Sequence, residues 1–424
     1  MTQNPWNRSL RIGFISTRFE GTDGVSLETE KWAAVLERCG HKCFYFAGEC
    51  DRPYEVSRII PEASFQHHEI AAINRTVYSQ QIRPPDVARR IQSIKNHLKD
   101  ELYRFISEFN LNLLIAENVL AIPIHLPLGM AITEVVAETG FPVIGHHHDL
   151  FWERKRFLTN CVWDILNSCF PPHLPTIRHV VINSSASNQL ALRTGISSTL
   201  IPNVMDFETP PAAPDDYARQ VRHDLGMDAD QFLILQPTRI VQRKGIEHAI
   251  ELVSRLYMDA RLVISHASGD EGYEYERFIR EYAQRMGVPT LFVSDIIKEK
   301  RGKTEDNRNI YTLQDVYPQA ALVTYPSDFE GFGNAFLEAI YYHRPILVNN
   351  YSIFNFDIKP KGFHVIEFDG YITQDSVNRA RKVLENPTMA EETANYNYEL
   401  ASHHFSYAVL ERRLNTILSE IFGE

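Results

Sequence analysis

Cysteine is scarce in this sequence and is not arranged for cross-linking or metal binding. Five cysteines occur among 424 residues, and no two of them have the Cys-x-x-Cys spacing. An odd, dispersed set of cysteines argues against a disulfide framework and against a closed zinc site. We therefore expect five reduced thiols with structural roles.

The sequence also lacks an excess of positive charge and any long apolar run. Lys and Arg number 43 against 54 Asp and Glu, a formal net charge of -11, so there is no basic footprint for nucleic acid. The N-terminal segment has no basic start followed by an apolar run, and the most apolar stretch, residues 111–130, carries Glu117 and His125. We therefore expect a cytoplasmic protein with no signal peptide, no integral membrane segment and no nucleic-acid partner.

What the sequence does contain is a regular alternation of short apolar runs and longer amphipathic stretches. This alternation is typical of strand-helix units built around mostly parallel sheets, so an α/β fold is predicted. The length favours two domains, and the runs fall into two series on either side of residue 230. The predicted strands occupy residues 11–16, 43–48, 111–117, 142–147, 179–184, 232–237, 260–266, 290–295, 320–326 and 344–349.

A segment rich in Pro and acidic residues, 202–220, separates the two series and is interpreted as a linker. We predict an N-terminal Rossmann-like domain over 1–205 and a C-terminal Rossmann-like domain over 206–400. A terminal helix over 401–424 would dock by its apolar face and could return to the first domain. Ligands bind beyond the carboxyl ends of parallel strands, so the strand-to-helix loops should carry the chemistry.

The most informative loop follows the predicted strand at 320–326. Glu330 and Glu338 stand there with seven residues between them, around Gly331 and Gly333. The glycines allow close approach of the backbone to a ligand, and a helix starting near Gly333 would offer N–H groups to a phosphate. Two carboxylates suit a ligand rich in hydroxyl groups. The structural alternative is a surface Glu and a helix Glu around a glycine turn.

A second loop, after the strand at 232–237, carries two cations. Arg239 and Lys244 are five residues apart and precede Gly245, a spacing that could neutralise a diphosphate. The alternative is a pair of solvated charges, since Arg243 stands directly beside Lys244.

Together these motifs closely resemble the retaining GT-B glycosyltransferases of family 4, the glycosyl transferases group 1. The resemblance extends over nearly the whole chain and includes the order and spacing of the motifs. The matching positions are Arg239, Lys244, Gly245, 315–317, Glu330 and Glu338 in the second half, and 21–26, 146–149 and 201–206 in the first half.

The resemblance implies a GT-B fold, in which two Rossmann-like domains face each other across a cleft. It implies a retaining enzyme that moves a hexose, glucose or mannose, from a nucleotide-diphosphate sugar such as GDP-mannose or UDP-glucose. The partners would be a small-molecule donor and acceptor, with no further cofactor. No metal is expected, because there is no Asp-x-Asp motif at a strand end and side chains with a helix terminus would take the role of the metal.

The resemblance also assigns roles to individual residues of the donor site. Arg239 and Lys244 would hold the diphosphate and stabilise it as it departs, and Glu330 would contact hydroxyls of the donor sugar near the reacting carbon. The other implied donor-binding positions are Glu338 at the ribose, the backbone of Phe332, Gly333 and Asn334, Gly24 in the first loop, and Ser294 near the base.

Three consecutive histidines, His146 to His148, end the predicted strand at 142–147. The family places one His beside the transferred sugar, and we favour His147 or His148 because they immediately precede Asp149. The predicted catalytic set is therefore Glu330, His147, His148, Arg239 and Lys244.

The segment after the histidines, 149–157, is predicted to bind the acceptor. Trp152 could stack on a sugar face, and Arg154, Lys155 and Arg156 form a positive cluster in an acidic protein. With Asp149, they could bind a small soluble acceptor that carries a carboxylate or phosphate, such as a glycerate-type compound or a sugar phosphate. The alternative is a solvated helix face.

Other functions fit part of the pattern. A glycosyltransferase directed at a lipid or polysaccharide is the alternative within the class. Outside the class, a nucleotide-sugar epimerase or a non-catalytic bilobal sugar-binding protein would share the two-domain outline. A dehydrogenase is disfavoured because no G-x-G-x-x-G follows the first strand.

Overall fold

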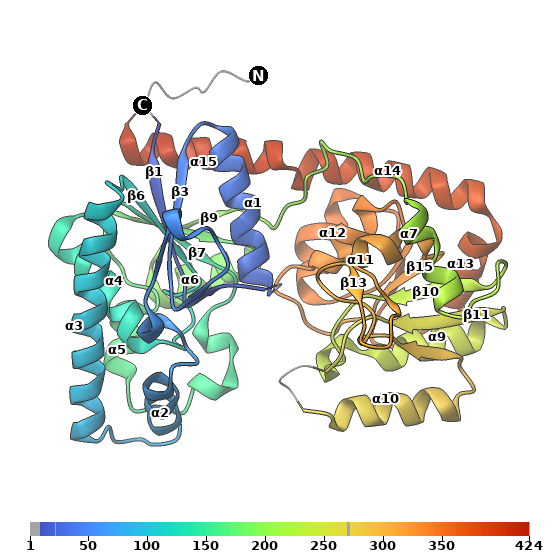
Figure 1. The fold of residues 1–424 in the computed structure, drawn as a ribbon, viewed down its shortest axis with the longest axis horizontal. Coiled ribbons are helices and arrows are strands. Elements are labelled where there is room, and N and C mark those ends of the chain that lie inside the picture. Colours follow the sequence, from blue (N-terminus) through green and yellow to red (C-terminus); the bar gives the residue numbers. More distant parts are fainter. Residues whose placement is uncertain (1–8, 22, 269–271, 424) are drawn as a thin grey trace. The chain divides into compact units, whose positions relative to one another are not determined.

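The computed structural model describes residues 9–21, 23–268 and 272–423. The chain divides into two compact units, each built on one parallel sheet. The first comprises Met1–Asn203 with Tyr407–Glu424, and the second comprises Val204–Ser406 (Figure 1).

The first unit contains a sheet of seven parallel strands in the order β5-β3-β1-β6-β7-β8-β9. Its central strands are nearly continuous apolar runs because helices cover both faces of such a sheet. The strands are β1 (Arg11–Ile15), β3 (Lys42–Ala47), β5 (Ser57–Ile59), β6 (Leu113–Glu117), β7 (Val143–His147), β8 (Ile177–Val181) and β9 (Ser198–Leu200), and a short parallel pair is formed by β2 (Arg18–Phe19) and β4 (Glu49–Cys50).

The helices of the first unit bury apolar stripes against this sheet and against each other. On α3, Ile91, Leu98 and Phe105 recur at helical spacing and are almost wholly buried, and this helix packs on α4. The helices are α1 (Gly24–Arg38), α2 (His68–Val77), α3 (Pro85–Glu108), α4 (Leu126–Thr139), α5 (Trp163–Cys169), α6 (Ser184–Thr194) and α15 (Tyr407–Phe422).

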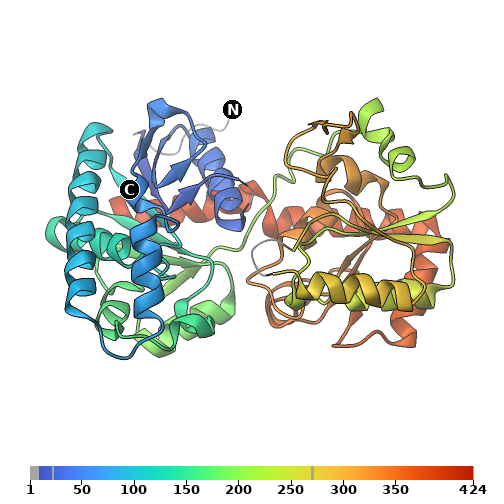
Figure 2. The same ribbon diagram turned by 60° about the horizontal axis from the view of Figure 1, so that its bottom comes forward.

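The second unit contains six parallel strands in the order β12-β11-β10-β15-β16-β17. From β10 the chain first adds β11 and β12 on one side and then β15, β16 and β17 on the other. Since parallel crossovers are right-handed, α9 (Ile246–Leu256) and α10 (Glu274–Arg285) lie on one face of the sheet and α12 (Asn334–Tyr341) on the other, as Figures 1 and 2 show. The strands are β10 (Phe232–Gln236), β11 (Ala260–Ile264), β12 (Thr290–Phe292), β15 (Leu322–Tyr325), β16 (Ile346–Asn349) and β17 (Ile366–Phe368), with an antiparallel pair of β13 (Gly302–Lys303) and β14 (Asn309–Ile310).

The helices of the second unit begin with two short ones that follow the linker. The full set is α7 (Asp216–Arg219), α8 (Val221–Asp224), α9 (Ile246–Leu256), α10 (Glu274–Arg285), α11 (Leu313–Val316), α12 (Asn334–Tyr341), α13 (Gln374–Glu385) and α14 (Pro387–Phe405). No helix in the described residues is both long enough and apolar enough to cross a bilayer.

The α/β prediction is confirmed, because each of the ten predicted runs contains or overlaps a strand. The expectation of a single terminal helix over 401–424 is wrong. Ser406 adopts an extended conformation between α14 and α15 and pairs with Met205 in a parallel bridge. Beyond this break, α15 belongs to the first unit and packs on α1, where Arg38 forms an ion pair with Glu411 at 3.2 Å.

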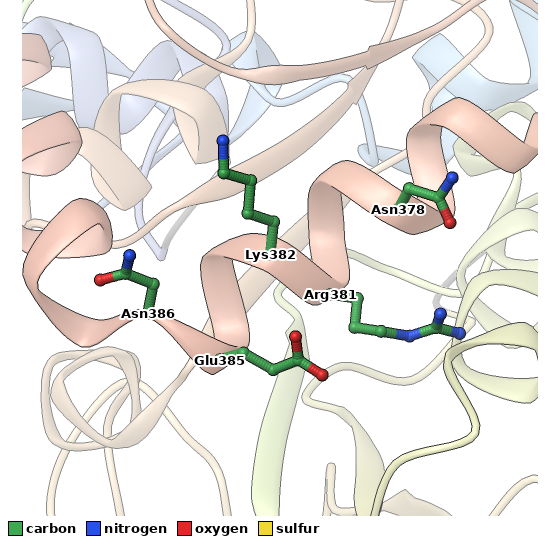
Figure 3. A pocket seen from close by; sticks show the side chains of 5 residues that line it. All are labelled: Asn378, Arg381, Lys382, Glu385 and Asn386. Atoms are coloured by element: carbon green, nitrogen blue, oxygen red, sulfur yellow. The ribbon is translucent and has the colours of Figure 1, made fainter.

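A surface hollow on α13 serves helix packing (Figure 3). Arg381 lines it and donates to the backbone carbonyls of Arg255 and Leu256, at 3.2 and 3.0 Å, where α9 ends. A cation that satisfies the last carbonyls of a helix stabilises that end of the helix. We therefore interpret the charged lining of this hollow as part of the contact by which α13 packs on α9. Its lining residues are Asn378, Arg381, Lys382, Glu385 and Asn386.

One buried histidine gives the first unit a predictable sensitivity to acid. His125 precedes α4 and accepts a hydrogen bond at Nδ1 from the backbone N–H of Leu128 at 3.1 Å, while Nε2–H donates to the Glu62 carbonyl at 2.7 Å. Nδ1 must be unprotonated to cap the helix in this way. Burial lowers the pKa of His125 to about 4.

We expect His125 to destabilise the fold as the pH falls. The unfolded chain binds this proton near pH 6.5 and the folded chain only near 4, so stability is retained above 6.5 and lost between 6.5 and 4, by on the order of 3 kcal/mol. His125→Asn keeps a capping oxygen without this titration and should flatten the curve of unfolding free energy against pH in urea denaturation. The exposed His173→Asn serves as the control; equal slopes for both variants would contradict the prediction.

Candidate active site

The predicted diphosphate and sugar residues meet in the second unit. Glu330 lies in the loop after β15 and accepts hydrogen bonds from Lys244 Nζ and from Arg243 Nη1, the latter at 3.2 Å. Lys244 and Glu330 are each 9% exposed. The three side chains therefore form a preassembled ion-pair cluster. Arg243, interpreted above as a sign of solvated charge, is part of it.

Gly245 fixes the position of Lys244. Its φ of +57° lies in the left-handed region, and a Cβ atom there would stand 2.5 Å from the Pro326 carbonyl oxygen. Only glycine allows the turn after Lys244 to approach the loop after β15 this closely. The ammonium of Lys244 then lies 5.3 Å from the centre of the Tyr325 ring.

Charge coupling determines the ionisation of this cluster. Burial raises the pKa of Glu330, but the charges of Lys244 and Arg243 outweigh burial and bring that pKa below its usual value. Burial lowers the pKa of Lys244, and Glu330 offsets part of this effect. Glu330 is therefore an anion at neutral pH, and Lys244 would gain from further negative charge placed beside it.

The glycine turn before α12 is formed as predicted. Gly333 has a φ of +131°, and a Cβ atom there would stand 2.4 Å from Tyr351 Oη, which donates to the Phe332 carbonyl at 2.7 Å. Asn334 is the first residue of α12. Further along α12, Glu338 accepts a hydrogen bond from the buried Tyr317 Oη at 2.7 Å.

The remaining donor predictions fall at the same edge of the sheet. Arg239 follows β10, Ser294 follows β12 and Glu330 follows β15, and these strands lie close together in the sheet order. Arg239 is exposed and, among the residues described, its guanidinium has no hydrogen-bond or ion-pair partner. His266, after β11, is half-buried; its pKa is lowered by desolvation and then by the charges of Arg239 and Lys244.

In the first unit, a carboxylate missed in the sequence joins two of the three histidines. Glu117 ends β6 and pairs in register with His146 on β7. Its Oε2 atom accepts from His146 Nδ1 at 2.9 Å and lies 3.4 Å from His148 Nε2. We call Glu117, His146 and His148 the Glu117 cluster. The signal available in the sequence was the acidic residue at the end of the strand LLIAE, which is otherwise apolar.

The Glu117 cluster is tightly enclosed. The ring of His146 stacks on Trp32 of α1, with 4.1 Å between centroids. Three ligand-type atoms of the cluster lie within 4.8 Å of one another. Since one carboxylate oxygen serves both imidazoles at hydrogen-bond distances, we describe the cluster as hydrogen-bonded.

The prediction that His147 contacts the donor sugar is wrong for this structure. Successive side chains of a strand point to opposite faces, so His147 points away from His146 and His148. It is fully buried, and its Nε2 lies 2.8 Å from His179 Nδ1. Burial holds the pKa of His147 well below its usual value, which keeps the ring neutral. His148, with 11% of its side chain exposed, remains the candidate.

The predicted acceptor residues are only partly available. Trp152 donates from Nε1 to Gln189 Oε1 at 2.9 Å, contacts Phe151 edge-on and is covered by Arg193 at 5.4 Å from the ring centre. These contacts occupy part of the half-buried Trp152 ring, and its stacking on a sugar stays a prediction.

Arg154 lies between two single-turn 3-10 helices, Phe151–Glu153 and Lys155–Phe157. Arg154 forms an ion pair with Asp149, which also accepts from Asn118 Nδ2 at 3.0 Å. The Arg156 guanidinium lies 4.6 Å above the Phe157 ring.

Gly24 lies at the start of a helix, and its approach to the donor stays a prediction. It is the first residue of α1, which Asp23 caps by accepting from the N–H groups of Val25 and Ser26 at 3.1 and 3.2 Å. A Cβ atom at Gly24 would meet no atom within 4 Å. Among the described residues, none comes close enough to Gly24 to require glycine at this position.

Comparisons with known proteins agree with this arrangement of strands and loops. The model of the family described as glycosyl transferases group 1 matches residues 218–400. Mannosylglucosylglycerate synthase of Thermotoga maritima is 31% identical, covering 95% of this chain and 98% of the relative. The enzyme of the same name from Petrotoga mobilis is 31% identical, covering 84% and 86%.

A solved structure supports the fold over the full length. The Anabaena HepE protein, crystallised with UDP and glucose, superimposes with a TM-score of 0.63 at 15% identity, covering 97% of this chain and all of that one. Its fold is that of the GT-B glycosyltransferases, with two Rossmann-like domains. The chain described here therefore belongs to the glycosyl transferases group 1, has the GT-B fold and is a hexosyltransferase.

Proposed function

We propose that the chain transfers a mannosyl group from a nucleoside diphosphate mannose to glucosylglycerate, with retention at the anomeric carbon. The observation that carries this proposal is the 31% identity to two mannosylglucosylglycerate synthases, which extends over 98% of the Thermotoga maritima relative. The name of that product contains a mannose, a glucose and a glycerate. A lipid-directed transferase is not favoured by these relatives.

The reaction breaks the bond between the anomeric carbon and the diphosphate oxygen. A new glycosidic bond forms on the same face to an acceptor hydroxyl, whose proton passes to the departing diphosphate. Negative charge therefore grows on the diphosphate, and positively charged groups beside it should stabilise the transition state most. Lys244, Arg239 and the first N–H groups of α12 would supply this stabilisation, while Glu330 contacts the sugar and Glu338 the ribose.

The acceptor is proposed to be recognised through its carboxylate. Arg154 stands in a positive cluster of an acidic chain and is paired with Asp149. A substrate carboxylate could replace Asp149 as the partner of Arg154, because a guanidinium binds carboxylates in a bidentate manner.

Replacing Arg154 with Ala is expected to raise the acceptor KM about 10- to 100-fold, the value of a charge-assisted hydrogen bond. The Kd of the nucleotide should not change, since nucleotide contacts are proposed in the other unit. Initial rates against acceptor concentration, with isothermal titration of the nucleotide, measure both quantities. Lys155→Ala, which removes an exposed charge beside Arg154, is the control; an acceptor KM that stays the same in Arg154→Ala would refute the role.

The proposed function is tested by a matrix of donors and acceptors. GDP-mannose, UDP-glucose and ADP-glucose are each incubated with glucosylglycerate, its phosphorylated form, and a glucosyl lipid in vesicles. Mass spectrometry identifies the product, and the anomeric proton coupling reports the configuration. Mannosylation of glucosylglycerate is the expected result. Exclusive transfer to the lipid, or an inverted product, would contradict the proposal.

A further inference from the structure

The Glu117 cluster contains a carboxylate whose burial needs an explanation. Glu117 is 0% exposed, and its Oε1 atom is buried with no hydrogen-bond partner among the described residues. Such an oxygen destabilises a fold by about 1–3 kcal/mol or more, which makes a purely structural role unfavourable. The hydrogen bonds of the Glu117 carboxylate go to the two imidazoles, and both use Oε2.

The two imidazoles occupy different positions. His146 is buried against Trp32, and its Nε2 atom is enclosed without a partner. His148 is the partly exposed member, and its Nε2 faces Glu117. Its other ring nitrogen, Nδ1, has no hydrogen-bond partner in the described chain and is not among the fully buried polar atoms. Glu117 thus determines which nitrogen of His148 remains available to a substrate.

The surroundings of His148 are predominantly acidic. Glu117 approaches it from β6, the fully buried Glu28 from α1, and Asp149 follows it in the chain. The ring of His146 lies 4.5 Å from its own. Burial lowers the pKa of His148, but the hydrogen bond and charge of Glu117, followed by the charges of Glu28 and Asp149, outweigh burial and raise it.

We propose that Glu117 is a positioning residue for hexose transfer. Its carboxylate accepts from Nε2–H of His148 and holds that ring as an imidazolium, which leaves Nδ1–H to donate to an oxygen of the bound substrates. This inference rests on the proposed function. Glu117 itself touches no substrate and acts through His148, while the stack of His146 on Trp32 holds the carboxylate in place.

The test is Glu117→Gln, which keeps the shape of the side chain and removes its charge. We expect kcat to fall about 10- to 100-fold with a nearly unchanged donor KM. The alkaline limb of the pH-rate profile should move to lower pH by about one unit, because a neutral neighbour no longer favours the imidazolium. Glu117→Asp should restore part of kcat and of the alkaline limb.

The matched control is Glu101→Gln. Glu101, on α3, is another buried carboxylate of the first unit. It forms ion pairs with Arg58 of β5 and Arg104 of α3 and is not part of the Glu117 cluster. This variant should lose stability without moving the alkaline limb. Should Glu117→Gln fail to fold, His148→Gln takes its place, and the alkaline limb should then disappear.

The outcomes separate this inference from the proposed function. Inactivity of the wild type on every donor and acceptor refutes the proposed function alone; the pKa of His148, followed by NMR in wild type and Glu117→Gln, then tests the inference. An unmoved alkaline limb, or a shift of the acid limb instead, would overturn it. Stoichiometric binding of Zn²⁺ or Mn²⁺ that Glu117→Gln abolishes would overturn it too, since the cluster would then be a metal centre.

Discussion

Replacing Lys244 with Ala is expected to lower kcat for hexose transfer by about 10²- to 10³-fold, the effect of removing one preorganised group that stabilises charge in a transition state. Lys244 is held between Glu330 and the Tyr325 ring. It is therefore in position before the donor binds and needs no reorganisation when charge grows on the diphosphate. Steady-state rates at saturating donor measure the effect.

Arg243→Ala is the comparison for this prediction. Arg243 contacts the same carboxylate at 3.2 Å, but 37% of its side chain is exposed. Water can therefore replace most of its effect, and we expect less than about a tenfold loss in kcat. Equal losses in the two variants would indicate that Lys244 acts only by holding Glu330. An unchanged kcat in Lys244→Ala would remove Lys244 from the chemistry.

Replacing Glu330 with Ala is expected to lower both stability and activity. The side chains of Glu330 and Lys244 are 10% and 11% exposed, so removal of the carboxylate leaves a buried ammonium without its anion. Breaking such a pair from one side lowers the free energy of unfolding by about 3 kcal/mol. Urea denaturation measures the loss of unfolding free energy. Hexose transfer from the donor should be nearly abolished, because Lys244 is no longer oriented.

Glu330→Gln distinguishes the two effects. The amide keeps an acceptor for Lys244 and the shape of the side chain, so the loss of stability should be smaller while the loss of activity stays large. The exposed Glu305→Ala, in the same unit, controls for a general effect of charge. A Glu330→Ala variant as stable as the wild type would show that Lys244 finds another partner or leaves the site.

The sequence was sufficient to predict the central strands and the α/β fold class. Runs such as 113–116 are apolar throughout because both faces of a parallel sheet are covered, and this pattern is visible without a structure. The edge strands β5, β9 and β17 were missed, since each has only three residues and lacks a continuous apolar run. The break at Ser406 was missed because helical spacing continues on both sides of it.

The site was predictable where its residues follow one another in the chain. Glu330 lies in the loop after β15 and Glu338 in the helix that follows, so their spacing in the sequence was enough to predict a loop and helix around a glycine turn. Glu117 was not predictable, because its partner His146 is 29 residues away and the contact depends on strand register. The register between β7 and β8 likewise brings His147 to His179, which the run of three histidines could not indicate.

The break at Ser406 has a consequence for how the chain is held together. The backbone passes from the first unit to the second at residues 203 and 204 and returns at 406 and 407. The two passages are joined by the hydrogen bond from the Met205 N–H to the Phe405 carbonyl at 2.8 Å. A single cut in the loop at 208–214 therefore does not release the units. The last helix, packed on α1, would still carry the second unit as a tethered fragment, and only loss of both passages would separate them.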